Sequence, residues 1–170
     1  QNRWFGEHSL SVVRYALALR EASNSRPNID RDLIIAGGFL HDIGKTRTYI
    51  TESFKFDYSD DGYLEEHIAI GARLIELEVS KISGFPEETR RKLMHIVLSH
   101  HGELQFGSPV TPKTREAILI WLCDNIDSRL DNFESHAFSA SKESRWTDFS
   151  KMLQSRLYLG KIENEEEIGD

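Results

Sequence analysis

The chain has 170 residues, a length typical of one domain, and 39% of them are hydrophobic, which is enough for a single core. Its formal net charge of -7 argues against a general electrostatic grip on nucleic acid, so double-stranded DNA is not an expected partner. A single cysteine, Cys123, excludes a disulfide framework, and neither a signal-peptide pattern nor an apolar run of roughly 20 residues is found, so we expect a soluble, cytoplasmic protein without a membrane partner.

Six segments have the apolar spacing of amphipathic helices. They cover residues 7–20, 31–42, 64–79, 86–101, 114–130 and 144–159. Asp30 is the expected N-cap of the second segment, and residues 45–63 alternate and end in turn residues, as in a short hairpin or an ordered loop. The sequence therefore predicts an all-α bundle of about six helices with a short insertion, one domain over 1–160 and an acidic, disordered tail over 161–170.

Five of the seven histidines, together with two aspartates, occur in an order that suggests one metal site. The candidate ligands are His8, His41, Asp42, His67, His100, His101 and Asp124. Any one of these histidines alone would more often be a hydrogen-bonded core residue. His95 and His136 have no place in the pattern and are expected to be ordinary histidines.

The helical spacing puts His41, His67, His100 and Asp124 on the apolar sides of four different predicted helices. Such groups are costly to bury without partners, and helical bundles often build metal centres from inward-facing side chains. Six or seven ligands are too many for one catalytic ion, so we expect two ions bridged by an aspartate. The mixture of imidazoles and carboxylates favours Mn or Fe, with Co, Ni, Zn or Mg as alternatives.

The ordered ligands and the run GFLHDIGK at 38–45 resemble the HD-domain phosphohydrolase superfamily over residues 7 to about 130. Further segments are similar to the HD domain of the YhaM-type 3′-to-5′ exoribonucleases. These segments are EHSLSV at 7–12, LSHHGELQFGSP at 98–109, PKT at 112–114 and DNIDSRL at 124–130. The resemblance implies an HD-type helical bundle and a metal-dependent phosphohydrolase.

The resemblance also implies roles for individual residues. One ion would be held by His8, His41, Asp42 and Asp124, and Asp42 would bridge to a second ion held by His67 and by His100, His101 or both. The ions would activate a water for attack on phosphorus. Lys45, three residues after Asp42, would add positive charge opposite a phosphate oxygen.

Three functions stay open from the sequence. The first is a phosphodiesterase acting from the 3′ end of single-stranded RNA or oligonucleotides, with Phe106 stacking a base and Arg115 or Lys113 contacting a phosphate. The second is a phosphohydrolase acting on a small nucleotide or phosphomonoester. The third is a non-catalytic sensor that binds metal and ligand, against which the intact ligand set and Lys45 argue.

The YhaM-type enzymes carry an N-terminal OB-fold that grips the RNA, whereas the first candidate ligand here is already His8. The chain is therefore expected to be either the catalytic part of a longer protein or a compact relative with a smaller substrate. The sequence leaves open the native metal, the substrate and its length, and the oligomeric state.

Overall fold

The computed structural model describes residues 2–23, 28–52 and 55–160. The chain divides into two compact units, Gln1–Asn125 (unit 1) and Ile126–Asp170 (unit 2). The expected acidic tail, 161–170, lies outside the described residues. The expectation of one domain over 1–160 stays a prediction.

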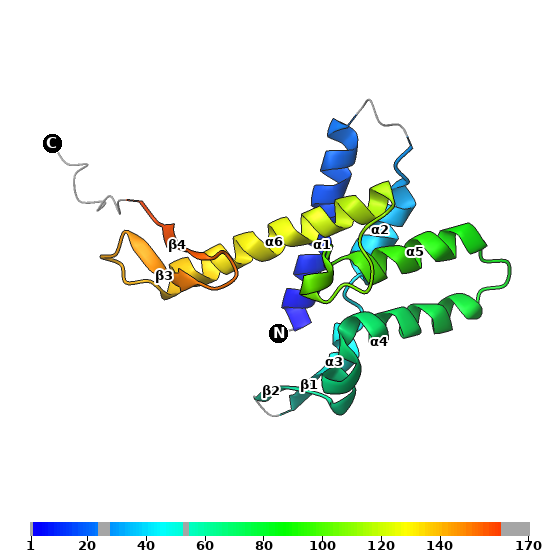
Figure 1. Ribbon diagram of the computed structural model, residues 1–170, viewed down its shortest axis with the longest axis horizontal. Helices are drawn as coiled ribbons and strands as arrows, with labels where there is room; N and C mark the ends of the chain where they lie inside the picture. Colours follow the sequence, from blue (N-terminus) through cyan, green and yellow to red (C-terminus); the bar gives the residue numbers. More distant parts are fainter. Residues whose placement is uncertain (1, 24–27, 53–54, 161–170) are drawn as a thin grey trace. The chain divides into compact units, whose positions relative to one another are not determined.

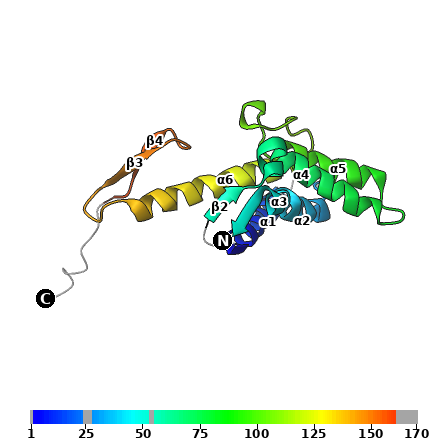
Figure 2. The ribbon, with the colours of Figure 1, turned by 90° about the horizontal axis from the view of Figure 1, so that it is seen from below.

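Unit 1 is built mainly from helices (Figures 1 and 2). Its long helices are α1 (Asn2–Ala22), α2 (Arg31–Leu40), α4 (Asp60–Ser80) and α5 (Glu87–Ser99), and α6 (Arg115–Ser139) begins in it. Its short elements are α3 (Lys45–Thr48), the strands β1 (Tyr49–Glu52) and β2 (Lys55–Tyr58), and the 3-10 helix η1 (Leu104–Phe106). The expected all-α class, with a hairpin after the His-Asp pair, is confirmed.

The helices begin where their first residues satisfy the free backbone N–H groups. The Asp30 carboxylate accepts from the backbone N–H groups of Asp32 and Leu33, so the predicted N-cap of α2 is confirmed. Ser59 caps α4 in the same way by accepting from the Gly62 N–H. Pro86 precedes α5, whose first turn carries Glu87 and Glu88 at the positive end of the helix dipole.

The hydrophobic core of unit 1 lies where α1, α2, α5 and the start of α6 meet. Val12, Ile34, Ile96 and Ile120, one from each of these helices, have no exposed surface. Two adjacent glycines let α2 approach its neighbours closely: a Cβ at position 37 would lie 2.8 Å from an Ile96 methyl, and one at 38 would lie 2.5 Å from a Val13 methyl. The close approach at these two glycines, in the last turn of α2, therefore brings His41 and Asp42, which follow the helix, into the centre of the unit.

The β1–β2 hairpin is antiparallel, with Tyr49 opposite Tyr58 and Ile50 opposite Asp57. It leads directly into α4, whose backbone departs from helical geometry at Glu66 (φ 63°, ψ 158°). This kink separates the first turns of α4 from the part that begins with His67. The α4 and α5 helices then lie side by side, as both views show (Figures 1 and 2).

Unit 2 holds the end of α6 and an antiparallel hairpin of β3 (Trp146–Ser150) and β4 (Ser155–Tyr158). The predicted sixth helix at 144–159 is therefore wrong. The apolar spacing there arises because Trp146 pairs across the strands with Tyr158, while Leu157 is buried on the other face and its N–H donates to Thr147 Oγ1. These pairings run across the turn between the two strands, and a helical pattern does not show them.

Within the described ranges, no helix combines the length and the apolar character that a bilayer span requires.

Candidate metal centre

The predicted pair His41 and Asp42 follows α2 directly and lies at the centre of unit 1. The exposed fraction is 0% for His41 and 1% for Asp42. Two groups of candidate ligands meet at this pair, and one of them includes His41 itself. In each group the candidate ligand atoms lie within 4.8 Å of one another.

The first group, called cluster A, consists of His8, His41 and Asp124. His8 comes from α1 and Asp124 from α6. The Nε2 atom of His8 lies 3.3 Å from Nε2 of His41 and 3.2 Å from Oδ1 of Asp124. Three segments far apart in the sequence thus present one nitrogen or oxygen atom each to a common point.

The second group, called cluster B, consists of His67, His100 and His101. His67 follows the kink in α4, and His100 and His101 follow the last residue of α5. The ring centres of His100 and His101 are 4.5 Å apart, and that of His67 lies 5.5 Å from His100 and 5.0 Å from His101. All three imidazoles therefore face one another.

The Asp42 carboxylate lies between the two clusters. Its Oδ2 atom is 3.7 Å from Nε2 of His8 and 3.6 Å from Nε2 of His41, both in cluster A. Its Oδ1 atom is 3.4 Å from Nε2 of His67 and 3.5 Å from Nε2 of His100, both in cluster B. Each carboxylate oxygen thus faces a different cluster, which is the arrangement a bridging ligand needs.

Unsatisfied buried atoms test whether these residues fit metal ions. Among the described residues, Oδ1 of Asp42, Nε2 of His67 and Nε2 of His100 are buried and make no hydrogen bond. Buried polar atoms without partners are costly and rare in folded proteins. All three are lone-pair donors that point at cluster B, so a divalent cation there would satisfy them together.

Backbone carbonyls fix three of the imidazoles in the tautomer that leaves Nε2 free for a metal ion. His41 Nδ1 donates to the Gly38 carbonyl at 2.8 Å, His100 Nδ1 to that of Val97 at 2.7 Å, and His101 Nδ1 to that of Phe106 at 2.8 Å. Because a carbonyl oxygen can only accept, each Nδ1 carries the proton. The Nε2 lone pair of each neutral ring is then available to a metal ion.

The electrostatics of the site agree with this assignment. Burial lowers the pKa of His41 to about 4 and that of His67 to about 3, and it also lowers the pKa of His101. Burial opposes ionisation of Asp42, but His41, His100 and Lys45 hold its pKa well below the ordinary value. At neutral pH the rings of His41, His67 and His101 are therefore neutral and the Asp42 carboxylate is ionised, the forms that bind metal.

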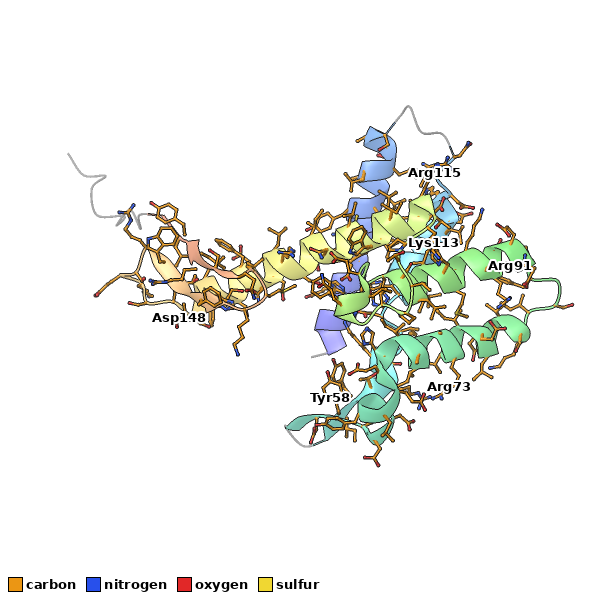
Figure 3. All side chains as sticks on the ribbon, viewed as in Figure 1. Tyr58, Arg73, Arg91, Lys113, Arg115 and Asp148 are labelled. Atoms are coloured by element: carbon orange, nitrogen blue, oxygen red, sulfur yellow. The ribbon has the colours of Figure 1, made fainter. Side chains whose placement is uncertain are left out.

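The other predicted site residues lie at different distances from the clusters. The Lys45 ammonium pairs with Oδ2 of Asp42. Phe106 is exposed, and its carbonyl holds the His101 ring. Arg115 begins α6, nine residues before Asp124, or about 13 Å along the helix. Figure 3 shows Arg115 and Lys113 well separated from Tyr58 of the hairpin.

The two histidines left out of the pattern have local partners. Nε2 of His95 accepts from the Lys113 N–H and so ties the loop before α6 to α5. In unit 2, His136 donates from Nδ1 to the Asn132 carbonyl and lines a surface hollow of about 290 Å³. Cys123, beside Asp124, is buried in the core.

One residue beside cluster B was missed by the sequence reasoning. Glu66 precedes His67, and its Oε2 lies 3.5 Å from Nδ1 of that histidine. The signal for it was only its adjacency to His67, and neither periodicity nor charge distinguishes it from Glu65.

Comparison with known proteins identifies a family for most of the chain. A family model described as the HD domain matches residues 5–129, a range that holds every candidate ligand. The 3′-5′ exoribonuclease YhaM of Shouchella clausii (strain KSM-K16) is 37% identical over 151 residues, which are 89% of this chain. The chain spans 46%, less than half, of that relative's length. No solved structure matches the chain.

The family match and the two clusters of candidate metal ligands both indicate a metal-dependent enzyme. The chain belongs to the HD-domain family of metal-dependent phosphohydrolases.

Proposed function

We propose that this chain hydrolyses phosphodiester bonds of single-stranded RNA or oligonucleotides from the 3′ end, with two divalent metal ions. The observation that carries the proposal is the position of Asp42, a buried carboxylate whose two oxygens face two different ligand clusters. A relative that is 37% identical is named a 3′-5′ exoribonuclease, which supports RNA as the substrate class.

The ligands divide between the ions as the clusters do. His8, His41, Asp124 and Oδ2 of Asp42 would hold one ion. His67, His100, His101 and Oδ1 of Asp42 would hold the other. Both His100 and His101 are included because each donates from Nδ1 to a carbonyl, which leaves Nε2 for the metal. The imidazole-rich set favours Mn or Fe.

When bound, the ions would lower the pKa of a water to near neutrality and neutralise charge on the phosphate. Asp42 keeps both ligand groups together, and the carbonyls of Gly38, Val97 and Phe106 hold the imidazoles in position. Lys45 pairs with the Asp42 oxygen that faces cluster A. Because a cation in cluster A would use that same oxygen, we expect Lys45 to turn to a phosphate oxygen and add positive charge there.

The first test is a time course on a 5′-labelled single-stranded RNA with added Mn, resolved on a sequencing gel. The expected result is a ladder that shortens from the 3′ end. The control is Asp42→Asn, which keeps the size of the side chain but removes the negative charge shared by the two clusters. It should lose activity by several orders of magnitude while its circular dichroism stays helical. Near-normal turnover in Asp42→Asn would remove the bridging assignment.

A small nucleotide is the second candidate substrate. It is favoured by the formal net charge of -7, which gives the chain no general electrostatic attraction to a long polyanion. If the metal-loaded chain leaves the RNA intact but releases phosphate from mononucleotides, the exoribonuclease proposal fails and this second candidate replaces it.

A further inference from the structure

Three tyrosines of the β1–β2 hairpin and of the first turns of α4 form a stack in unit 1. Tyr49 and Tyr58 have ring centres 4.9 Å apart and nearly edge-on, and Tyr58 and Tyr63 have ring centres 5.0 Å apart at an angle of 36°. The hydroxyl groups of Tyr49 and Tyr58 are 3.5 Å apart. The three residues are called the tyrosine cluster below.

The tyrosine cluster is tied to the candidate metal centre by close backbone contacts. A Cβ at Gly44 would lie 1.9 Å from the His67 carbonyl oxygen, and a Cβ at Gly62 would lie 2.4 Å from the Thr48 carbonyl oxygen. The Ser59 N–H also donates to the Thr48 carbonyl, at 2.8 Å. The segment from Asp42 to Tyr49 is thus held against both parts of α4. Consequently the tyrosine cluster is fixed relative to Asp42 and His67.

Charges of the metal centre reach the tyrosine cluster. Burial raises the pKa of Tyr49, and the contact with Tyr58 and the negative charges of Asp42 and Glu66 raise it further. Tyr49 is therefore the end of the tyrosine cluster on which the charge of the metal centre acts. Tyr58 packs on Tyr49, and Tyr63 packs on Tyr58 at the exposed end.

The outer end of the stack is open. Tyr63 is 68% exposed, and Tyr58 beside it is half-buried. Tyr63 is held in place all the same, because its hydroxyl donates to Oδ1 of Asp57 at 3.3 Å and the same oxygen accepts from the Tyr58 N–H at 2.8 Å. An exposed aromatic ring with a fixed position can stack on a nucleobase, and such stacking is tolerant of the base.

The charges around the tyrosine cluster are unsuitable for a phosphate. The carboxylate of Asp57 contacts Tyr63, and Asp60 precedes Tyr63 by one helical turn, so both negative charges lie beside the exposed ring. The cations Lys45 and Arg47 lie instead on α3, the short helix after Asp42, and the Lys45 ammonium pairs with the Asp42 carboxylate. A neutral nucleoside fits the acidic, aromatic end, where carboxylates can accept from ribose hydroxyls, while its phosphate fits the cationic end.

We propose that the tyrosine cluster is the subsite for the 3′-terminal nucleoside of the substrate. The base stacks on Tyr63 and Tyr58, the terminal ribose faces the carboxylates, and the phosphodiester that is cleaved lies at the candidate metal centre. The subsite rests on the proposed exoribonuclease function. It further requires a free 3′-hydroxyl, because a terminal 3′-phosphate would meet Asp57 and Asp60.

The test compares two RNA oligonucleotides that differ only at the 3′ end, one with a normal terminal nucleotide and one with an abasic terminal nucleotide. Full chains with Mn are assayed as wild type, Tyr63→Ala and Tyr158→Ala. The control residue Tyr158 is an exposed tyrosine of unit 2, outside the proposed subsite. Wild type and Tyr158→Ala should show a KM about tenfold higher for the abasic end, because one stacking contact is lost. In Tyr63→Ala the KM for the normal end should rise by a similar factor, and the two ends should become nearly equivalent.

A Tyr63→Ala chain that still discriminates between the two ends as wild type does would overturn the subsite. A 3′-phosphorylated RNA that is degraded as fast as the 3′-hydroxyl form would also overturn it. Tyr63→Phe, which keeps the ring, should retain most of the preference for a base.

Failure of the subsite and failure of the proposed function give different results. RNA cleavage that is indifferent to both Tyr63→Ala and the abasic end keeps the exoribonuclease function and removes the subsite. If no RNA is cleaved, fluorescence anisotropy of the two labelled oligonucleotides on the same three chains decides. Binding that needs both the base and Tyr63 supports the subsite without the exoribonuclease function, and binding that needs neither, or no binding, overturns it.

Discussion

At the scale of single residues, Asp42 is the part of the site with the most contacts. It faces His8 and His41 with one oxygen and His67 and His100 with the other, and Lys45 pairs with it. A buried carboxylate is stable in its ionised form only when such partners surround it. The same partners hold its pKa well below the ordinary value. Asp42 is therefore ionised in the folded chain even without a bound metal.

The buried histidines make the stability of the metal-free chain depend on pH. Burial lowers the pKa of His41 from 6.5 to about 4, so between these values the unfolded chain takes up a proton that the folded chain refuses. The contribution of the neutral His41 ring to the free energy of unfolding is fully present above pH 6.5 and is lost as the pH falls toward 4. The loss should be on the order of 3 kcal/mol for His41.

Urea unfolding in EDTA between pH 7.5 and 4.5 measures this loss. His41→Gln should flatten the slope, whereas His136→Gln, outside both clusters, should leave it unchanged. A wild-type free energy of unfolding that stays constant over this range would contradict the expectation.

Glu66 holds a backbone conformation that suits glycine. Its φ of 63° and ψ of 158° lie in a region of backbone conformation that is strained for any residue with a side chain. Such a residue lowers the free energy of unfolding by about 1 to 3 kcal/mol. Glu66→Gly should therefore raise the free energy of unfolding by about 1 kcal/mol relative to Glu66→Ala. Both variants lose the carboxylate beside His67, so their difference reports the backbone alone. The comparison needs only thermal unfolding, and an Ala variant as stable as the Gly variant would show that position 66 is unstrained.

At the scale of the elements, the short helix α3 docks on α4 through backbone contact. Gly44 has helical angles (φ -60°, ψ -27°) that any residue could adopt, so its role is steric. A Cβ there would meet the His67 carbonyl oxygen and the Gly71 N atom, both backbone atoms that cannot rotate away. The missing side chain thus allows the His-Asp segment to approach the histidine of α4.

Gly44→Ala should separate α3 from α4 and lower the free energy of unfolding by about 2 kcal/mol, as overpacking does. Because His67 would shift with α4, the affinity for Mn measured by calorimetry should also fall. The matched control is Gly6→Ala, where a Cβ meets nothing within 4 Å and the helix should gain about 0.5 to 1 kcal/mol. Equal stability of the two variants would contradict the docking argument.

At the scale of the whole molecule, the two units differ in how much they bury. All candidate ligands and nearly all buried hydrophobic side chains belong to unit 1. Among the described residues of unit 2, Leu157 is the one buried hydrophobic side chain. Segments with few buried apolar contacts open locally at low cost, so unit 2 should exchange its amide hydrogens faster than the core of unit 1.

Metal binding should increase the difference in amide hydrogen exchange between the two units. A ligand that binds only the folded state stabilises it by about 2.7 kcal/mol when its concentration is a hundred times the Kd. Because the clusters lie between His8 and Asp124, added Mn should slow hydrogen exchange in α1, α2, α4 and α5 and leave the β3–β4 hairpin unchanged. Hydrogen exchange followed by mass spectrometry measures both units in one experiment. Equal added protection of the hairpin would contradict the expectation that the metal stabilises unit 1 alone.

The features of this protein that depend on local interactions could be predicted from its sequence. The Asp30 cap and the first five helices depend on neighbours within one segment, and they were predicted correctly, as was an insertion of a hairpin or loop after the His-Asp pair. Four candidate ligands, His41, His67, His100 and Asp124, could be named because imidazoles and carboxylates on apolar helix faces need a common partner. The other three, His8, Asp42 and His101, followed from the order of the motif.

Features that depend on contacts between distant segments could not be read in this way. The hairpin of unit 2 follows from the pairing of Trp146 with Tyr158, which a helical pattern concealed. The facing of each Asp42 oxygen toward a separate cluster, and the stack of Tyr49, Tyr58 and Tyr63, arise from the packing of α1, α2, α4, α5 and α6. Side-chain identity and spacing specify which groups a helix offers, whereas only the packed helices bring groups from different segments within a few ångströms of each other.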